Sequence, residues 1–360
     1  MPLKINLSFP KYESTVLIGS QNEILAGEPG LFCRGKDVFL AIDANAGKCF
    51  PGFAAALAAH ARRLEKYTVP SGEANKTPET VIDMCRAAAR LGFGRDAVFA
   101  AVGGGVTGDI TAFAASIYMR GVPCIQFPTT LLAMLDSSIG GKTGCDLPEG
   151  KNLIGTFHQP PAVGMILDFL QTLPETELIN GIGEAAKYAL GFDTELFELF
   201  EADGAKISPE LIFRCASIKA HIVTGDEQES ASASRPGSKS RELLNLGHTF
   251  AHAIESATDF SVPHGAAVGT GCLLACDLAV MRGVMSEAEK ERVKTLWPRL
   301  GLKNILPHRL DTAELIDIMR RDKKRRNGKH RIVIPRGIGD CFVVDDVAEE
   351  ELAAVWREIC

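Results

Sequence analysis

The sequence predicts an α/β domain with a mainly parallel sheet over residues 1–160 and an all-α domain over residues 161–360. In the first half, short β-branched runs alternate with alanine-rich amphipathic segments, as in βαβ units. Pro160 and Pro161 mark a hinge between the halves. Beyond them, helical periodicity runs through residues 177–203, 210–227, 242–260 and 265–283, with few strand signals.

Length and composition describe a soluble globular protein. A chain of 360 residues is long enough for two domains, and 46% hydrophobic with 23% charged residues is typical of the globular class. The formal net charge of -6 gives no general attraction to nucleic acid or to an anionic membrane, so a phosphate site requires a local basic patch. We expect no signal peptide at the N-terminus, and no uninterrupted apolar run is long enough to span a bilayer.

The cysteines favour a reducing compartment. All ten are scattered without a C-x-x-C pair, and most lie in apolar surroundings, which favours buried reduced thiols over disulfides or a zinc knuckle. Cys272 and Cys276 are spaced four apart on a helical run, where core packing is the simpler interpretation. We therefore expect a cytoplasmic protein.

The first elements lead to a possible ribose ligand. Val38 to Asp43 (VFLAID) reads as a buried strand, residues 51–67 as a helix, and residues 68–92 as a strand end, a polar loop and a second helix. Asp43, at the C-terminal end of its strand, could bind a ribose or could simply cap a helix. Glu73 and Lys76, in the polar loop, could line a cofactor crevice or be solvated.

A glycine-rich turn follows the next strand. Val98 to Val102 reads as a buried strand, and Gly103, Gly105 and Gly108 make G-x-G-x-x-G before the helical run DITAFAASIYM. Such a turn lets a dinucleotide pyrophosphate approach the helix N-terminus. About twenty residues further on, where an acidic ribose ligand is expected, CIQFPTT has no carboxylate, so that partner must come from elsewhere or not exist.

Polar residues then accumulate in a glycine-rich loop. Asp136, Lys142, Lys151 and Asn152 lie among Gly, Ser and Thr. A basic loop beside a dinucleotide turn indicates a second anion, such as a phosphorylated substrate. The alternative is a glycine-rich turn with solvated lysines.

The second half contains a candidate metal site. Glu184, His248 and His264 form a His/His/carboxylate set that suits catalytic Zn²⁺ or a similar ion, although each taken singly is more often solvated or a satisfied polar group. His252, one turn after His248, could complete the ligand set or shuttle protons, and Lys187, one turn after Glu184, faces the same site. We also predict that Arg241 and Asn245 immediately precede His248 on its helix.

Together these motifs resemble the 3-dehydroquinate synthase family of sugar-phosphate cyclases. The resemblance covers about Ser71 to Asp340 and rests on GGGVTGD, FPTTLLAMLDSSIGGKTGCDLPEGKNLIGTFHQP, GEAAKYAL, RELLNLGHTFAHAIE, VPHGAAVG and RDKKRRNGKHRIVIPRGIG, in the family's order. It implies an NAD⁺-binding α/β domain and a helical metal-binding domain. It also implies a phosphorus–oxygen lyase that converts 3-deoxy-D-arabino-heptulosonate 7-phosphate to 3-dehydroquinate and phosphate in the shikimate pathway.

The resemblance also implies roles for individual residues. The metal, Zn²⁺ or Co²⁺, would be bound by Glu184, His248 and His264. The substrate would be held by Asp136, Lys142, Asn152, Lys187, Lys219, Arg241, Asn245, His252 and either Lys323 or Lys324. Arg120 would reach the substrate phosphate of a neighbouring subunit, which implies a homodimer. The NAD⁺ site would be lined by Asp43, Gly72, Glu73, Lys76, Gly104, Gly105, Val106, Gly108, Asp109, Thr129, Thr130, Lys142, Lys151, Phe169, Leu170, Gln171 and Thr172.

Two departures from the family pattern stand out. Ala266 follows the HG of the third metal motif where the family usually has Glu (HGEAV), which could alter the surroundings of His264 or mark a subfamily. The Ser/Gly/Pro-rich stretch SASASRPGSKS before Arg241 is longer than the family's usual turn and reads as a mobile surface loop.

Other activities remain open from the sequence. SSIGGKTGCD favours a 3-dehydroquinate synthase over a 2-deoxy-scyllo-inosose or 2-epi-5-epi-valiolone synthase, whereas an aminodehydroquinate synthase is harder to exclude. A glycerol or iron-type alcohol dehydrogenase shares the architecture but lacks the lysine-rich phosphate site formed by Lys142, Lys151 and Lys187. A non-enzymatic binding module is a third alternative.

Overall fold

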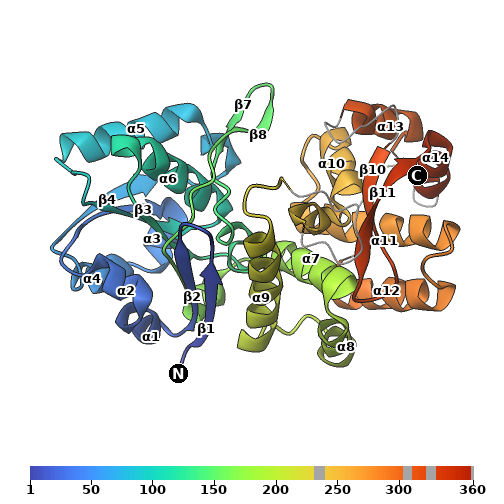
Figure 1. Ribbon diagram of the computed structural model, residues 1–360, viewed down its shortest axis with the longest axis horizontal. Coiled ribbons are helices and arrows are strands. Elements are labelled where there is room, and N and C mark those ends of the chain that lie inside the picture. Colours follow the sequence, from blue (N-terminus) through green and yellow to red (C-terminus); the bar gives the residue numbers. More distant parts are fainter. Residues whose placement is uncertain (231–239, 303–309, 322–329, 358–360) are drawn as a thin grey trace. The chain divides into compact units, whose positions relative to one another are not determined.

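A computed structural model describes residues 1–230, 240–302, 310–321 and 330–357. The chain forms two compact units. The first consists of Met1–Pro174 and Lys219–Thr224, and the second of Glu175–Ile218 and Gly225–Cys360. Figure 1 shows helices packed around a sheet in the first unit and a mainly helical second unit. The domain boundary after residue 160, with NAD⁺ bound by the first domain and metal and substrate by the second, stays a prediction.

The sheet of the first unit is mainly parallel, as predicted. Seven strands lie in the order β1-β2-β9-β6-β5-β3-β4; β1 is antiparallel to β2, and the other neighbours are parallel. The strands are β1 (Leu3–Ser8), β2 (Glu13–Gly19), β3 (Asp37–Asp43), β4 (Arg63–Val69), β5 (Val98–Gly103), β6 (Cys124–Pro128) and β9 (Ala162–Ile166). Because β5 is fully buried and lies between β6 and β3, its C-terminal end has a strand on each side.

Helices cover both faces of this sheet. Phe39 and Ala41 of β3 join the core cluster under α5 and α6, whereas Ile42, the residue after Ala41, meets α3 on the opposite face. Phe53 of α4 packs on Phe127 of β6 with ring centroids 5.1 Å apart. The helices of this unit are α1 (Gln21–Ala26), α2 (Glu28–Cys33), α3 (Ala44–Cys49), α4 (Phe53–Ala58), α5 (Pro78–Arg90) and α6 (Gly105–Ile117). Its short helical turns are η1 (Glu73–Asn75), η2 (Tyr118–Arg120), η3 (Ala133–Ser137) and η4 (Leu167–Thr172).

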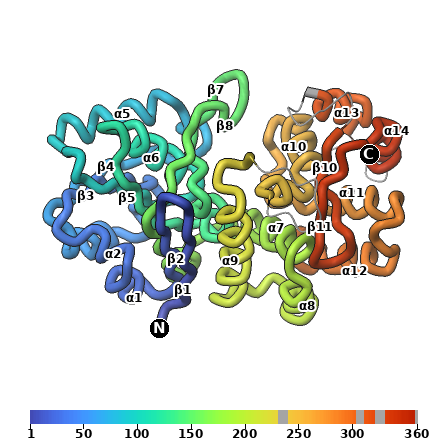
Figure 2. Tube along the Cα trace, viewed as in Figure 1, coloured from blue at the N-terminus to red at the C-terminus, as the bar shows by residue number. Residues whose placement is uncertain are grey.

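A two-stranded hairpin extends from the first unit. It consists of β7 (Cys145–Leu147) and β8 (Gly150–Ile154), and the trace in Figure 2 follows it away from the sheet. Its residues include Lys151 and Asn152, which the sequence places in a basic loop.

One helix prediction in this unit is wrong. Residues 51–67 do not form one helix, because α4 ends at Ala58 and Arg63–Val69 is the edge strand β4. β4 pairs with β3 over its whole length, from Asp37–Arg63 to Asp43–Val69. The charged sequence RLEKY is typical of the exposed face of a helix. Backbone hydrogen bonding to the buried strand β3 makes it a strand instead.

The second unit contains α7 (Glu175–Phe192), α8 (Thr194–Asp203), α9 (Pro209–Gly225), η5 (Arg241–Asn245), α10 (His248–Ala257), α11 (His264–Met281), α12 (Glu287–Arg299), α13 (Thr312–Arg321) and α14 (Glu349–Trp356). Residues Lys219–Thr224 of α9 belong to the first unit. The predominance of helix agrees with the prediction. An unexpected addition is the antiparallel pair β10 (His330–Pro335) and β11 (Cys341–Val347), whose fully buried β10 packs against α11.

Helix α11 is the buried centre of the second unit. It is long and apolar enough to cross a membrane by length and composition, yet 72% of it is buried inside the protein, as in the core helix of a globular domain. Cys272 and Cys276 are buried on it, which confirms their predicted packing role. The Ser/Gly/Pro-rich stretch predicted as a mobile loop lies outside the described residues, apart from Ser230 and Ser240.

The helix predicted to carry both Arg241 and His248 is interrupted. Arg241–Asn245 is the separate short turn η5, and α10 begins at His248 after Gly247, whose φ is 76°. A side chain at Gly247 would also lie 2.8 Å from Cys272 Sγ and 2.9 Å from the Cys272 backbone nitrogen. Positive φ and close packing against α11 therefore both require glycine here and break the helical path.

Candidate active site

The glycine turn lies where the sequence predicts it. β5 ends at Gly103 and α6 begins at Gly105, with Gly104 as an N-cap that offers no side-chain hydrogen bond and no acidic residue in the first turn. An added Cβ would lie 3.1 Å from Ser137 Oγ at Gly105 and 3.0 Å from Gln126 Oε1 at Gly108. The turn is thus closely packed. No side chain caps the first backbone amides of α6, so they can donate hydrogen bonds to a bound anion.

Beside this turn is a polar cluster around the buried Lys76. Lys76 Nζ lies 2.7 Å from Asp109 Oδ2 and 2.6 Å from Asn152 Oδ1. Burial raises the pKa of Asp109 against the opposing charge of Lys76. Asn152 has φ of 54°, and its backbone nitrogen donates to Asp146 over 2.7 Å, which ties the β7–β8 hairpin to Lys76. The structure thus joins Asn152, predicted to contact substrate, to residues predicted to contact NAD⁺.

Asp43 caps a helix. Its Oδ1 accepts from the backbone nitrogens of Asn45 (2.8 Å) and Ala46 (3.0 Å) at the start of α3. Of the two roles left open by the sequence, capping is therefore observed, and ribose binding stays a prediction. Because only Oδ1 makes these contacts, capping by itself does not exclude a ligand at Oδ2.

The remaining predicted NAD⁺ residues are distributed around the same strand ends. Thr129 and Thr130 follow β6, and the Thr129 backbone nitrogen donates to Gly103 over 2.9 Å. Lys151 Nζ lies 3.5 Å from Glu73 Oε1, with both side chains substantially exposed. Gly72 has φ of 101° before η1, Val106 lies in the first turn of α6, and Phe169, Leu170, Gln171 and Thr172 lie in η4.

A second polar group of the first unit joins Asp136 and Lys219. The Lys219 ammonium donates to the Asp136 carbonyl over 2.7 Å and lies 2.9 Å from its Oδ1. Lys142 is exposed and follows the positive-φ pair Gly140 and Gly141. Arg120 is exposed in η2, with φ of 67°.

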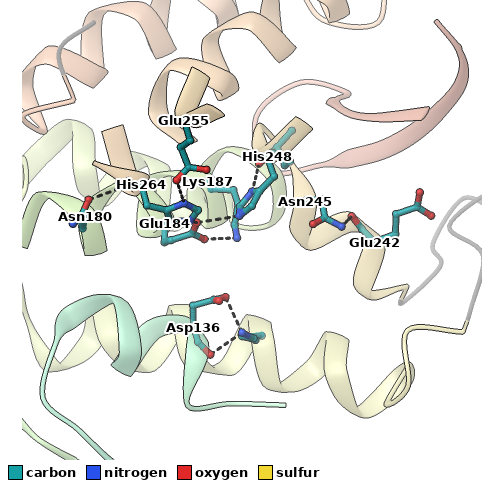
Figure 3. Close-up of polar contacts among 12 residues, drawn as sticks. Asp136, Asn180, Glu184, Lys187, Glu242, Asn245, His248, Glu255 and His264 are labelled. Carbon is teal, nitrogen blue, oxygen red and sulfur yellow. Dashed lines mark hydrogen bonds and ion pairs between the residues drawn. The ribbon is translucent and has the colours of Figure 1, made fainter. Parts of the chain in front are cut away.

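The predicted metal ligands converge in the second unit. Glu184 of α7, His248 at the start of α10 and His264 at the start of α11 offer ligand atoms that all lie within 4.8 Å of one another. His248 Nε2 and His264 Nε2 each lie 3.3 Å from Glu184 Oε1 (Figure 3). α7 and α11 can approach because Gly183 and Gly265, next to two of these residues, have no side chains; a Cβ at Gly183 would lie 2.1 Å from the Gly265 carbonyl oxygen.

The other ring nitrogens fix the orientation of both histidines. His248 Nδ1 lies 3.1 Å from the Leu246 carbonyl oxygen, and His264 Nδ1 lies 3.0 Å from Glu255 Oε1. A carbonyl or a carboxylate can only accept, so both Nδ1 atoms donate. When the rings are neutral, the lone pairs are therefore on the Nε2 atoms that face Glu184, as a metal site requires.

The electrostatics keep Glu184 ionised. Burial favours the neutral acid, but Lys187 and the two histidines hold the pKa of Glu184 well below its usual range. Burial lowers the pKa of His248. At His264, burial is outweighed by the interactions with Glu184 and Glu255, which raise its pKa to about 10. Two carboxylates, those of Glu184 and Glu255, therefore face His264 and favour positive charge at this position.

Lys187 and His252 lie beside the ligands, as their spacing predicts. Lys187 is 1% exposed and forms an ion pair with Glu184. The His252 ring is exposed, with its centroid 5.6 Å from that of His248. Among the described residues, the cluster of ligand atoms comprises Glu184, His248 and His264, and both roles left open for His252 stay predictions.

Arg241 and Asn245 are positioned by η5. Arg241 is buried; its backbone nitrogen donates to Asp226 Oδ2 over 3.0 Å and its guanidinium to the Glu227 carbonyl over 2.9 Å. Asn245 Nδ2 donates to the Glu242 carbonyl over 3.1 Å. Lys323 and Lys324 lie outside the described residues, so their predicted role is not tested.

Sequence reasoning missed the residues that support the ligands. Glu255 and Asn180, whose Oδ1 accepts from the Gly265 backbone nitrogen over 3.0 Å, were not singled out. Glu255 lies two turns after His248 on α10, inside the HTFAHAIE motif. Its spacing on the His248 face was the available signal.

The side chains fit a divalent cation. The two oxygens of Glu184 are buried, and among the described residues neither accepts a hydrogen bond of good geometry. One carboxylate and two imidazoles with Nδ1 already donating form the donor set of a catalytic Zn²⁺ or Co²⁺ site with an open position. The glycine turn likewise fits a dinucleotide, because its backbone amides are uncapped.

Comparison with known proteins agrees with this geometry. Residues 66–180 match the family model of the 3-dehydroquinate synthase N-terminal domain, and residues 181–325 match the C-terminal one. The chain is 38% identical to the 3-dehydroquinate synthase of Xanthomonas campestris pv. campestris, over 97% of this chain and 99% of the relative. It is 40% identical to that of Pelobacter propionicus, over 81% of each chain.

A solved structure extends the comparison. The 2-epi-5-epi-valiolone synthase of Streptomyces hygroscopicus subsp. jinggangensis, with NAD⁺ and Zn²⁺ bound, is 30% identical and superposes with a TM-score of 0.82 over 98% of each chain. The fold is therefore that of a sugar-phosphate cyclase. Taken with the two family models, these relatives show that the chain belongs to the 3-dehydroquinate synthase family.

Proposed function

We propose that this chain converts 3-deoxy-D-arabino-heptulosonate 7-phosphate to 3-dehydroquinate and phosphate, with catalytic NAD⁺ and a divalent metal ion. The observation that carries the proposal is the convergence of Glu184, His248 and His264 in a chain of this family. The metal supplies a Lewis acid that lowers the pKa of a bound substrate hydroxyl, and NAD⁺ accepts and returns one hydride.

In this proposal the first unit binds NAD⁺. The uncapped N-terminus of α6 supports pyrophosphate binding, and the Lys76–Asp109–Asn152 cluster fixes the walls of the site. Asp43 is the acid that would bind a ribose hydroxyl of NAD⁺. It would do so through Oδ2, because only Oδ1 caps the helix. The remaining predicted NAD⁺ residues keep their proposed roles.

The charged residues have distinct proposed roles in the reaction. Lys142, Lys219, Lys187, Arg241 and one of Lys323 and Lys324 bind the substrate's carboxylate and phosphate as fixed cations. Asp136 orients Lys219, which donates to it twice. Asn152 and Asn245 offer neutral polar groups to hydroxyls. His252, which is exposed beside the ligands, moves protons between the site and solvent.

We further propose a cytoplasmic homodimer. Ile117, Met119, Leu153, Ile154 and Phe157 expose between 37% and 44% of their surfaces. A hydrogen bond of 2.8 Å between Ser116 and Thr156 joins the segments that present them. This exposed apolar surface supports self-association, with Arg120 directed to the partner's phosphate. Sedimentation should give a dimer, and a monomer at micromolar concentration would refute this part.

The decisive experiment follows phosphate and NADH together. The purified enzyme with Zn²⁺, NAD⁺ and the heptulosonate phosphate should release phosphate over many turnovers with no net rise in NADH absorbance. Chelation should abolish turnover, and added Zn²⁺ or Co²⁺ should restore it. NADH accumulating in step with product would instead indicate a net oxidoreductase, and full activity in a metal-free preparation would refute the role of the ligand set.

A further inference from the structure

The imidazole of His264 lies between two carboxylates. Its Nε2 lies 3.3 Å from Glu184 Oε1 and its Nδ1 lies 3.0 Å from Glu255 Oε1 (Figure 3). One carboxylate belongs to the predicted ligand set, and the other belongs to none of the predicted sites. Glu255 is therefore a charged group whose placement the proposed function has not yet explained.

Glu255 is buried, so its position against His264 has an energetic reason. Only 9% of the residue is exposed, whereas an uncompensated carboxylate costs free energy when it leaves water. It comes from α10, two helical turns after His248, and α10 packs along α11, which begins at His264. Helix α10 thus supplies the predicted ligand His248 at its first residue and, further along, Glu255, the hydrogen-bond partner of the ligand His264.

The interaction selects one state of His264. A carboxylate at Nδ1 holds the proton on that nitrogen, turns the ring so that Nε2 faces Glu184, and makes Nε2 a stronger electron donor. His248 obtains its orientation from the Leu246 carbonyl, a neutral group. The two histidines therefore differ. His264, whose partner is charged, should donate electron density from Nε2 to a metal ion more strongly than His248.

Position 266 does not provide this partner. Ala266, where the family usually has Glu, is buried on α11 and has no acidic group. The carboxylate at His264 Nδ1 is instead that of Glu255, which comes from the neighbouring helix α10.

We propose that Glu255 is a positioning residue that orients His264 and raises the affinity of the Glu184–His248–His264 set for its metal ion. This inference rests on the proposed metal site. Groups that orient a metal-bound histidine typically contribute 10–100-fold in metal affinity. We expect a loss of about that size on removal of Glu255.

The test measures metal binding rather than turnover. The Kd for Zn²⁺ is determined by competition with a chromophoric chelator, and the visible spectrum of the Co²⁺-loaded protein reports ligand geometry. Glu255→Ala should weaken Zn²⁺ binding about 10–100-fold and change the Co²⁺ spectrum. Glu255→Gln, which keeps the shape and an accepting oxygen, should lose less affinity and keep a spectrum closer to wild type. Glu291→Gln, an exposed carboxylate on α12, is the matched control and should change neither.

The outcomes separate this inference from the proposed function. A wild-type chain that binds no metal would overturn both. Tight wild-type binding with a Kd for Glu255→Ala within twofold, and an unchanged Co²⁺ spectrum, would overturn only the role of Glu255. If the alanine variant does not fold, the isosteric glutamine variant decides: a Kd and spectrum equal to wild type would show that the charge of Glu255 does not act on His264.

Discussion

The contact between Gly183 of α7 and Gly265 of α11 determines how closely Glu184 approaches His264. A Cβ at Gly183 would lie 2.1 Å from the Gly265 carbonyl oxygen and 2.5 Å from its carbonyl carbon. Both are backbone atoms, which cannot rotate away as a flexible side chain would. Gly183→Ala therefore requires the two helices to separate at this point.

The expected effect combines two opposing terms. Alanine in place of glycine inside a helix is favourable by about 1 kcal/mol. Overpacking a close contact costs about 1–3 kcal/mol, and a backbone-to-backbone overlap belongs at the upper end of that range. We therefore expect a net loss of free energy of unfolding on the order of 2 kcal/mol, together with weaker metal binding, because Glu184 moves with α7 and His264 with α11.

The assay is equilibrium urea unfolding of the metal-free protein combined with the Zn²⁺ competition titration. Gly269→Ala on α11, the helix that Gly183 contacts, is the matched control, because the atoms nearest to a Cβ there are Leu302 side-chain atoms at 3.4–3.5 Å, an ordinary van der Waals contact. The control should keep or gain stability and bind Zn²⁺ normally. A Gly183→Ala variant as stable as Gly269→Ala, with unchanged Zn²⁺ affinity, would refute the argument that this glycine contact holds the ligands together.

Three further predictions concern other parts of the chain. Lys142→Ala should lower kcat at least about a hundredfold, because a fixed ammonium near a leaving phosphate contributes a few kcal/mol; the exposed Lys11→Ala is the control, and an equal kcat would place Lys142 in solvent. Mixing Arg120→Ala with Lys142→Ala subunits should recover about a quarter of wild-type activity at statistical mixing, since half the dimers are mixed and each has one intact site; no recovery despite proven exchange would confine Arg120 to its own chain. Burial lowers the pKa of His158, whose Nε2 lies 2.9 Å from the Val122 carbonyl oxygen. Because the unfolded state then binds a proton at this histidine more readily than the folded state, the free energy of unfolding should fall as the pH falls below about 6.5. His158→Gln should flatten that part of the urea-midpoint profile, and profiles of equal slope would contradict the assignment.

Local patterns predicted much of the fold and the principal site residues. The buried run Val98–Val102 and the glycines after it predicted β5 and the start of α6, because a strand, a tight turn and a helix each have local composition. The donor types of Glu184, His248 and His264 predicted a metal site, and their helical spacing correctly placed Lys187 beside Glu184. The NAD⁺ and substrate roles stay predictions.

Tertiary structure alone decided the features that depend on contacts distant in sequence. Arg63–Val69 is a strand because β3 offers it a buried pairing partner, whereas its own charges suggested a helix. The break at Gly247 follows from close packing against Cys272 of α11. Glu255 reaches His264 only because α10 and α11 pack together, so the spacing along α10 could place it on the His248 face but could not identify its partner. Periodicity specifies the face of an element, and packing specifies what that face meets.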